Sequence, residues 1–418
     1  MKKQLLIIMA LLLPMVVTAR IYTLDECRKL SLENNAKIKI AGNDQQTASA
    51  DKWEAFTNFL PSVSIAGGGM KSTEPMMKMQ MGDMSMSMLD GGWYGSAMLS
   101  LPLFAGGRIY NGYQMAKLGV EISDLQRRQT ENEVRLTVNQ YYWQIVTLKE
   151  KLKTLQSMKT LLDNIIRDVN NAVEAGVTKP NDLLQAKLRS NDNHSVSVDI
   201  EKNIEIARMM LAQVMGVPAD DLEIEANIDS ELVAPEGFYT DHLSAVELTP
   251  EYQLLSKSVE AAERQKKIAR GEFLPTVSVS GGYMFQNMMG PSQNSLMGML
   301  TVSIPISWKT KSTMRKQSLA VENATTQLND GHDQLIIKMQ AARNGLESAY
   351  QQALIAKTSI EQAAENLRLN ENYYKAGIST MSDLLEAQAL YQQSRDKYAE
   401  AYSTYEIKKT EYLLATGR

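Results

Sequence analysis

The feature that most constrains this chain is an internal duplication. Three motifs recur in the same order later in the chain: Phe59–Ser64 returns as Phe273–Ser278, Leu99–Leu103 as Val302–Ile306, and Ala175–Val177 as Ala376–Ile378. A pattern repeated at this distance predicts one structural unit that is built twice. We divide the chain into a first repeat at 20–216, a connector at 217–241 and a second repeat at 242–418.

Each repeat contains one unusually long helical segment. Residues 108–175 and 309–376 are proline-free stretches of 68 residues each, and 1.5 Å per residue predicts helices of roughly 100 Å. Their apolar positions follow steps of four and three, at Val134, Val138, Tyr141, Ile145, Leu148, Leu152, Leu155, Leu162, Val169 and Val173, and again at Leu335, Met339, Ala342, Leu346, Ala349, Ala353, Ile360, Ala363 and Leu367. This 3.5-residue period indicates coiled-coil packing.

The long helices are predicted to turn back at narrow tips. Gly176 and Gly377 suit the left-handed position that ends a helix. Thr178 is a candidate helix cap before Pro180, and Ser379 and Thr380 occupy the matching place. We expect returning helices at 181–215 and 382–416, and shorter helices at 23–57 and 242–272 that precede the strands.

The last predicted helix has a tyrosine at every seventh position: Tyr391, Tyr398, Tyr405 and Tyr412. Such a stripe is typical of a helix-packing seam. A ligand-stacking surface is the alternative.

Helical periodicity stops in the segments 61–102 and 275–305. Apolar residues alternate there with small or polar ones, at Val63, Ile65, Ala97, Leu99, Leu101 and Leu103, and at Val277, Val279, Leu300, Val302, Ile304 and Ile306. This predicts four strands of the length that crosses an outer membrane; a small soluble sheet is the alternative. Four strands are too few to close a barrel, which needs about eight. Several subunits must therefore pool their strands, and two or three copies would give eight or twelve.

The N-terminal residues 1–19 have the features of a secretory signal. Lys2 and Lys3 precede an apolar core at Leu5–Val17, and Ala19 completes a small-residue cleavage site. No other stretch is long and apolar enough for a membrane-spanning helix, so we expect any membrane crossing to use strands.

Cysteine content and net charge argue against a disulfide-stabilised, lipid-anchored or nucleic-acid-binding protein. The single cysteine, Cys27, permits no internal disulfide. Because it lies eight residues beyond the predicted cleavage point, we interpret it as a helix residue rather than a lipid attachment site. The net charge of −4 provides no footprint for nucleic acid.

The chain resembles the TolC-like outer-membrane efflux proteins in three features. These are the duplicated Phe-Leu-Pro strand blocks, the heptad helices, and the Ala-Gly tips followed by Asp-Leu-Leu. The resemblance covers nearly the whole chain after residue 19. It implies a mainly α fold with a membrane β-barrel portion, in which a homotrimer forms a twelve-stranded barrel and a long helical tunnel. It further implies an outer-membrane location with most of the chain in the periplasm, and no cofactor. A periplasmic adaptor and an inner-membrane pump or exporter are the implied partners.

The resemblance also implies a gate where the tips converge. The acidic gate positions of the second tip are Asp383 and Glu386, the tyrosine before the turn is Tyr374, and Asp182 is the equivalent of Asp383 in the first tip. Threefold symmetry would make each inward carboxylate a ring that favours cations. The alternative is that Asp182 and Asp383 only stabilise helix N-termini. Some relatives have an arginine in the second tip, but Ser379 stands there, so a carboxylate–arginine lock is not expected.

In the family the tips also form the surface that contacts the adaptor. The matching residues are Ala175, Gly176, Val177 and Leu183 in the first repeat, and Ala376, Gly377, Ile378 and Leu384 in the second. We predict that these residues dock the adaptor.

The first strand pair is joined by a longer, methionine-rich loop. Proline-to-proline spacing is 41 residues in the first repeat and 30 in the second, and the extra length contains Met76, Met77, Met79, Met81, Met84, Met86 and Met88. Thioethers are soft ligands for Cu(I) or Ag(I), so a metal site is one hypothesis. A flexible, adaptable surface loop is the other.

Two other functional classes are weighed against a channel. His194, His242 and His332 are scattered, and nucleophile, phosphate-loop and metal-ligand motifs are missing from the sequence, which predicts that the chain is not an enzyme. A periplasmic coiled-coil adaptor also uses helical hairpins, but it normally has one hairpin and lacks paired lipid-facing strands. The sequence does not indicate which cargo would pass.

Overall fold

The computed structural model describes residues 20–418 apart from 75, 82–83, 89–90, 220–221, 227, 229–230 and 289–291. The predicted secretory signal at 1–19 lies outside the described residues. Within the described part of the chain, none of the helices has the length and apolar composition needed to cross a membrane.

The chain forms two compact units, and each repeat contributes to both. The sheet unit comprises Asn43–Gln126 and Glu251–His332, and the hairpin unit comprises the described residues up to Gly42 together with Arg127–Pro250 and Asp333–Arg418. The helix α3 (Ala36–Thr57) extends from one unit into the other, and so do two much longer helices, α4 (Arg108–Glu174) and α8 (Thr310–Lys375). Their lengths confirm the prediction from the two proline-free stretches.

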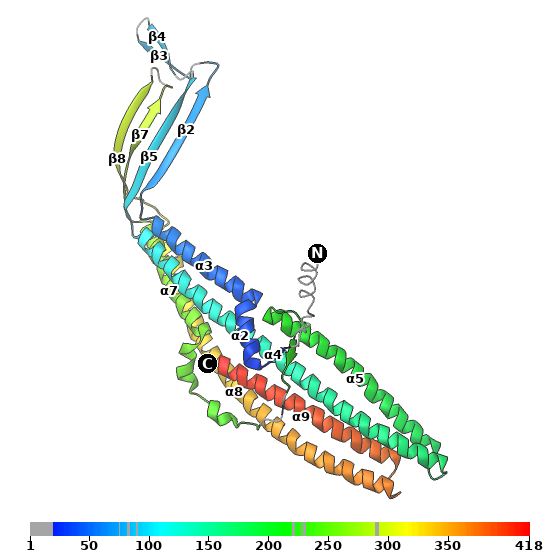
Figure 1. Ribbon diagram of the computed structural model, residues 1–418. Coiled ribbons are helices and arrows are strands. Elements are labelled where there is room, and N and C mark those ends of the chain that lie inside the picture. Colours follow the sequence, from blue (N-terminus) through cyan, green and yellow to red (C-terminus); the bar gives the residue numbers. More distant parts are fainter. Residues whose placement is uncertain are drawn as a thin grey trace, which may run out of the picture. The chain divides into compact units, whose positions relative to one another are not determined.

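In the sheet unit, four antiparallel strands lie in the order β2 (Ser62–Lys71), β5 (Gly91–Ala105), β7 (Thr276–Gln286) and β8 (Gln293–Ser303). Figure 1 shows this sheet at one end of the unit, next to α3 and α7. The four predicted strands are confirmed. The predicted strands are wrong in two places. The strand β8 ends at Ser303, before Pro305, which has no N–H for the ladder. Leu103 lies in an irregularity of β5 between Pro102 and Phe104.

The register divides the sheet into two chemically different faces, because successive residues alternate and paired residues share a face. The apolar face comprises Val63, Ile65, Trp93, Ala97, Leu99, Leu101, Phe104, Val277, Val279, Tyr283, Phe285, Leu296, Leu300 and Val302. The polar face carries Ser62, Ser64, Ser96, Ser100, Ser278, Ser280, Ser295, Thr301 and Ser303. Ile65 and Leu296 are 84% and 85% exposed, so this chain alone leaves its apolar face uncovered.

The methionine-rich segment is not the plain loop that we expected. It contains a two-stranded antiparallel ladder of β3 (Met77–Met81) and β4 (Met84–Met88), at the end of the sheet away from the helices (Figure 1). Alternating methionine with serine, lysine or glutamine satisfies the period-2 pattern of a strand. The length difference between the repeats therefore corresponds to an added hairpin.

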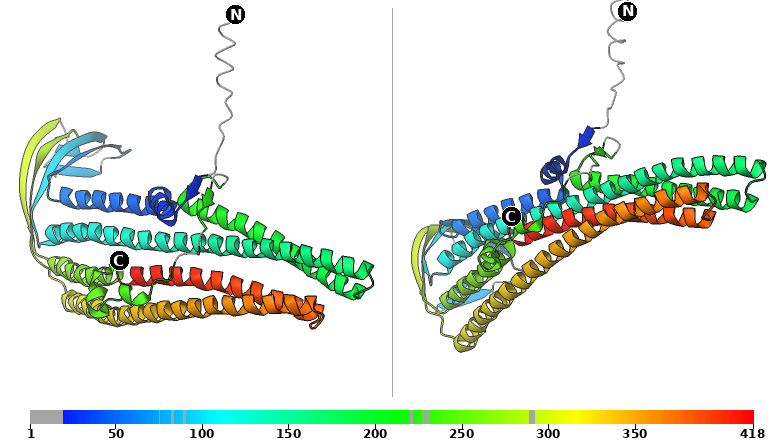
Figure 2. Two further views of the ribbon diagram at one scale, coloured as in Figure 1. Left: turned by 60° about the horizontal axis from the view of Figure 1, so that its bottom comes forward. Right: turned by 90° about the horizontal axis from the view of Figure 1, so that it is seen from below.

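Two helical hairpins make up most of the hairpin unit (Figure 2). The helix α4 returns through α5 (Pro180–Met215), and α8 returns through α9 (Met381–Ala415). The predicted seam is confirmed where it is buried, at Val134, Val138, Ile145, Leu155, Leu162 and Val169 of α4 and at Met339, Leu346, Ala349, Ala353, Ala363 and Leu367 of α8.

The two shorter helices are interrupted where the sequence predicted continuous segments. The first is split into α2 (Leu24–Asn34) and α3 (Ala36–Thr57) at Asn35, whose side-chain amide donates to the Val214 carbonyl at 2.8 Å. The second begins as α6 (His242–Ala245) and a 3₁₀ turn, η2 (Val246–Leu248), before α7 (Pro250–Gly271). Pro250 ends the preceding helical turn because it has no backbone N–H.

The connector packs against the hairpins. A short parallel ladder joins β1 (Arg20–Tyr22) to β6 (Leu222–Ile224), and a 3₁₀ turn, η1 (Pro235–Phe238), follows. Tyr405 donates its hydroxyl to the Val233 carbonyl, and Tyr412 accepts from the Thr240 amide at 3.1 Å. Both rings are buried, which confirms the seam interpretation at these two positions.

Cys27 is fully buried in the main apolar cluster of the hairpin unit. This burial raises the pKa of its thiol to about 12. The position agrees with the interpretation of Cys27 as an ordinary helix residue.

Candidate gate, docking tips and sheet surfaces

Both tips end their first helix in the same way. Gly176 and Gly377 each have φ of +70°, the left-handed region that a side chain disfavours. In the first tip the Val177 amide donates to the Ala172 carbonyl at 2.8 Å, and in the second the Ile378 amide donates to the Tyr373 carbonyl at 2.8 Å. The two glycines therefore have the role that the sequence predicted.

The returning helices begin differently. In the second tip Thr380 and Asp383 form a reciprocal cap, with the Thr380 amide donating to Asp383 Oδ2 at 2.8 Å and the Asp383 amide donating to Thr380 Oγ1 at 3.2 Å. In the first tip Lys179 is the capping residue and makes no side-chain cap bond. The expected cap at Thr178 is therefore wrong, because Pro180 starts the helix and leaves Lys179 at the capping position.

The Thr178 hydroxyl instead donates to Asp182 Oδ2 at 2.9 Å. Tyr374, at the end of α8, is half-buried, and burial together with the charge of Asp182 raises the pKa of its phenol, while a hydrogen bond from Thr178 opposes this rise. The structure thus brings Tyr374 and Asp182 together across the two hairpins through a threonine that the sequence analysis assigned to another role.

The other two predicted gate residues lie on the first turns of α9. Asp383 is fully exposed to solvent, and hydrogen bonds from the Thr380 amide and hydroxyl hold its pKa below the usual range. Glu386 is exposed one turn further along the helix. The capping contact supports the alternative interpretation for Asp383 as a helix-stabilising residue, and it also fixes where this carboxylate stands.

The predicted docking residues differ in accessibility. Val177 and Ile378 are 80% and 74% exposed at the outermost turns. Leu384 is buried with Ile165 and Val169 in the apolar cluster between the hairpins, and Leu183 is half-buried against the same cluster. Ser382 donates to Gln185 at 3.4 Å, which links the two returning helices directly.

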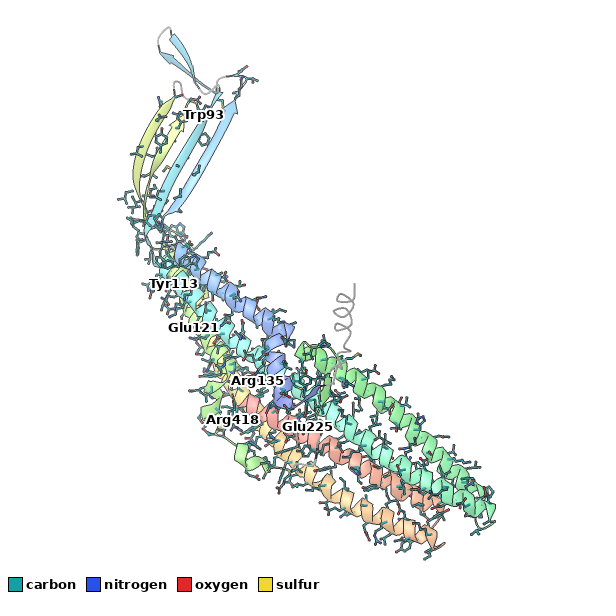
Figure 3. All side chains as sticks on the ribbon, viewed as in Figure 1. Trp93, Tyr113, Glu121, Arg135, Glu225 and Arg418 are labelled. Atoms are coloured by element: carbon teal, nitrogen blue, oxygen red, sulfur yellow. The ribbon has the colours of Figure 1, made fainter. Side chains whose placement is uncertain are left out.

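The sheet unit has aromatic residues near both ends of its strands. Trp93 stacks near Phe285 with ring centroids 4.2 Å apart, and Tyr113 contacts Phe56 and Phe59 with centroids 6.1 Å apart. Figure 3 labels Trp93 at the far end of β5 and Tyr113 at the start of α4. The apolar face of the sheet lies between these two groups.

The sequence profile of the outer membrane efflux protein family matches residues 28–217 and 245–418. The chain belongs to this family. It is therefore an outer-membrane channel component of an efflux system, and the alternative of a periplasmic adaptor is not supported. A search of curated protein sequences finds no match.

Solved structures of membrane proteins share the fold. The outer membrane protein VceC of Vibrio cholerae is 13% identical, with a TM-score of 0.79, and the match covers 94% of this chain and 96% of that one. A membrane protein from Pseudomonas aeruginosa has a TM-score of 0.81 at 14% identity, covering 94% and 90%. The CmeC channel of Campylobacter jejuni has a TM-score of 0.78 at 17% identity, covering 94% and 85%.

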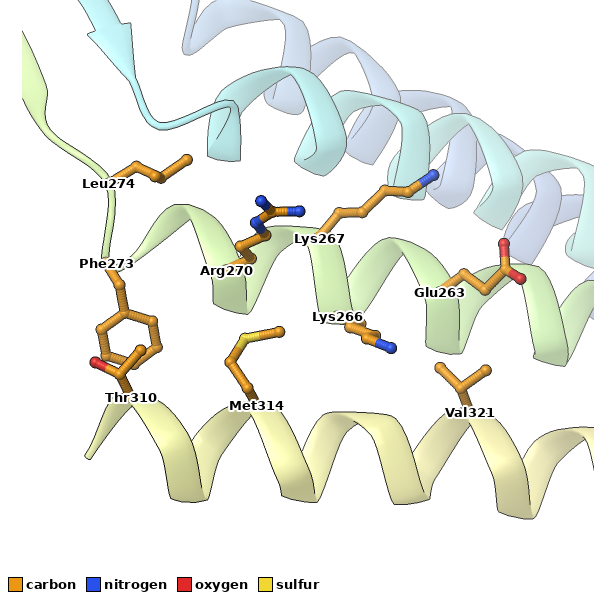
Figure 4. Close-up of a pocket in the computed structure, with 9 residues that line it drawn as sticks. All are labelled: Glu263, Lys266, Lys267, Arg270, Phe273, Leu274, Thr310, Met314 and Val321. Carbon is orange, nitrogen blue, oxygen red and sulfur yellow. The ribbon is translucent and has the colours of Figure 1, made fainter. Parts of the chain in front are cut away.

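This efflux protein has a cavity of about 610 Å³ in its sheet unit, between α7 and α8 (Figure 4). Lys266 points toward α8, whereas Lys267 and Arg270 point toward α4, and Glu263 is the acidic residue among those that line the cavity. Phe273 and Leu274 close the end next to β7. The cavity thus combines cationic groups with apolar walls directly below the strands.

A second cavity of about 330 Å³ lies beside Tyr374 in the hairpin unit. Charged residues of α4 and α8 line it, namely Arg167, Asp168, Glu371 and Lys375. The sequence analysis missed this polar site near the tips. Its signal was the placement of Arg167 and Asp168 between the seam residues Leu162 and Val169.

Proposed function

We propose that three copies of this efflux protein pool their sheets into a twelve-stranded barrel that crosses the outer membrane. The helices then form a periplasmic tunnel, which receives substrates from an inner-membrane pump or exporter through an adaptor. The main support for this proposal is the four-stranded sheet. Its edge strands β2 and β8 each pair on one side only within the described sheet, and one face is apolar except for Lys71 and Asn294 near the end away from the helices. Unpaired edges are not tolerated in lipid, so the strands of neighbouring copies must complete the ladder.

The dimensions of the apolar face support a membrane location. From Trp93 to Phe104 along β5 there are eleven residue steps, which correspond to about 36 Å along a strand and about 26 Å across a membrane at a 45° tilt. Outer-membrane barrels have an apolar band about 25 Å tall between aromatic girdles. The aromatic groups at Trp93 and Tyr113 mark the two boundaries.

The cationic groups below the strands fit the same placement. Lys266, Lys267 and Arg270 lie at the helix end of β7 (Figure 4). Basic side chains at this level meet lipid phosphates, and their long apolar stems remain against the membrane boundary.

Fractionation followed by conductance measurement tests the proposal. We expect the protein in the outer-membrane fraction, extracted by detergent as a heat-modifiable trimer that conducts ions in planar bilayers. Recovery as a soluble periplasmic protein would contradict the channel.

We further propose that the tips contain the gate, with Asp182, Tyr374, Asp383 and Glu386 at its constriction. The support is chemical and positional. Asp383 and Glu386 are exposed on the first turns of α9, and Tyr374 stands with Asp182 at the junction of the two hairpins. A carboxylate repeated in three copies makes a ring of negative charge that attracts cations.

Charge removal at α9 tests this gate. Replacing Asp383 and Glu386 with alanine should raise conductance and weaken cation preference. The pair Asp383→Asn and Glu386→Gln keeps side-chain size and the bond to Thr380, so it should weaken cation preference with little change in conductance. Asp199 and Glu201, exposed on α5, provide the matched control pair. Unchanged selectivity in both variants would place the gate elsewhere.

For adaptor docking we propose the exposed residues of the tips. Val177 and Ile378 stand furthest out, with Ala175, Gly176, Ala376 and Gly377 beside them and Leu183 partly accessible. Leu384 supports this surface from inside the apolar cluster. Crosslinking from cysteines placed at 177 and 378 should capture the adaptor, and the co-purified exporter would then identify the transport system.

A further inference from the structure

Methionine is distributed unevenly over the four-stranded sheet. Within strands β2, β5, β7 and β8, which the structure describes throughout, five methionines occur: Met70, Met98, Met284, Met297 and Met299. The register puts all five on the polar face, among serines. The leucine, isoleucine, valine and phenylalanine residues of the same strands follow the opposite rule on the apolar face, apart from Leu103 at the irregularity. A surface that only required apolar volume would not separate methionine from the other apolar residues so completely.

Four of these methionines gather around a glycine. Met98 of β5 and Met297 of β8 both pair with Gly282 of β7, one from each side. A Cβ on Gly282 would lie 2.7 Å from Met98 Sδ, so the Met98 thioether lies over the glycine backbone. The same Cβ would also meet the Ala97 carbonyl oxygen and Met98 Cα, so the place left by the missing side chain is taken by β5, including the Met98 thioether.

Met284 and Met299 border the same position. Met284 is two residues beyond Gly282 on the same strand face, and Met299 is two residues beyond Met297. We call Met98, Met284, Met297 and Met299 the thioether patch. Met297 and Met299 are 41% and 57% exposed, and Met98 and Met284 are half-buried, so the patch is accessible from the polar face.

We propose that the thioether patch binds a soft monovalent cation, Cu(I) or Ag(I), as cargo on its way through the channel. Thioethers are soft ligands that select Cu(I), and hard cations prefer oxygen. The ligands are neutral, and conduction requires sites that are weak enough to release the ion. This inference rests on the proposed function, because the polar face lines a conduit when the sheets of three copies close.

The added hairpin extends the same pattern beyond the sheet. Its register pairs Met77 with Met88, Met79 with Met86, and Met81 with Met84. Residues that are paired directly, or two apart along a strand, share one face of a ladder. By register, six methionine positions thus fall on one face of the hairpin.

The experiment is a titration of the full-length trimer in detergent with Ag(I), which is stable in air. Converting the four patch residues to leucine keeps apolar volume and removes the sulfur ligands. We expect this variant to bind fewer Ag(I) ions per chain than wild type, with weaker silver–sulfur scattering in X-ray absorption spectra. The pair Met297→Leu and Met299→Leu, at exposed positions, gives the same test with less disturbance of packing.

Two controls locate the site. Met209→Leu and Met210→Leu change exposed methionines of α5 and should leave Ag(I) binding unchanged. Converting the six hairpin methionines to leucine should leave the patch site intact. Equal Ag(I) stoichiometry in wild type and the four-leucine variant would overturn the proposal. If, in addition, the four-leucine variant passed an apolar drug differently from wild type, the patch would be an adaptable apolar lining instead of a metal site.

Bilayer measurements separate this inference from the proposed function. If wild type does not conduct K⁺, the channel proposal fails, whereas Ag(I) binding in detergent still reports on the patch. If wild type conducts and Ag(I) reduces the K⁺ current, the four-leucine variant should lose this block.

Discussion

At the scale of single residues, Asp396 of α9 stands in an environment that disfavours its charge. Its Oδ1 atom is buried without a hydrogen-bond partner among the described residues. Burial is the main reason why its pKa rises to about 6; Glu400 adds to the rise, and Lys151 and Arg395 oppose it. Lys151 pairs with Glu400, so its positive charge is shared between two carboxylates.

The raised pKa sets the sign of a pH effect. The folded state holds the proton up to about pH 6, whereas the unfolded chain releases it near the ordinary value of 3.8. The contribution of Asp396 to the free energy of unfolding is therefore largest at low pH and is lost as the pH rises through about 6. Asp396→Asn should raise the free energy of unfolding at pH 7.5 by about 1–2 kcal/mol, after a discount for partial solvent screening.

Urea unfolding of the trimer between pH 4 and pH 8, followed by circular dichroism, measures this effect. The Asn variant should depend less on pH across this range than wild type. Asp199→Asn on the exposed face of α5 serves as the control. An identical pH slope in wild type and Asp396→Asn would show that Asp396 is not the responsible group.

At the scale of elements, the two faces of β8 give a prediction from adjacent residues. Leu300 lies on the apolar face and Thr301 on the polar face. Arginine on a lipid-facing position costs about 2–4 kcal/mol at mid-membrane and less toward the membrane boundaries, whereas positions facing the lumen tolerate charge. Leu300→Arg should therefore reduce the amount of heat-modifiable trimer in the outer membrane, and Thr301→Arg should assemble normally and shift ion selectivity toward anions.

Membrane fractionation and bilayer recordings of the two variants provide the measurement. Equal assembly of both would indicate that the face assignment is wrong. Reversed behaviour would mean that the polar face meets lipid, which would also remove the thioether patch from the conduit.

At the scale of the whole molecule, local rules predicted most of the elements. The 3.5-residue period, the tip glycines and the alternating strands depend on residues close together in the sequence, and each of these features is present in the structure. The break at Asn35 was missed because its cause is a contact with Val214, which is remote in the sequence. The β1–β6 ladder was missed for the same reason.

The candidate site was less predictable than the fold. The positions of the four gate residues came from the family resemblance, but the contact between Thr178 and Asp182, and the approach of Tyr374 to both, depend on how two hairpins pack. The cation-lined cavity and the thioether patch likewise join residues of different elements. Periodicity places a residue on a face of its own element, and it does not determine which element lies opposite.

The ladder between β5 and β7 has a consequence for biogenesis. Ala105 pairs with Thr276, so β5 emerges from the ribosome and the export machinery long before its partner. Until β7 arrives, the hairpin of β2 and β5 carries an open strand edge, which is a template for wrong pairing with other chains. Non-local pairing of this kind is also slow. We therefore expect a longer exposure of this edge during transit to lower the number of finished channels without changing the properties of the channels that form.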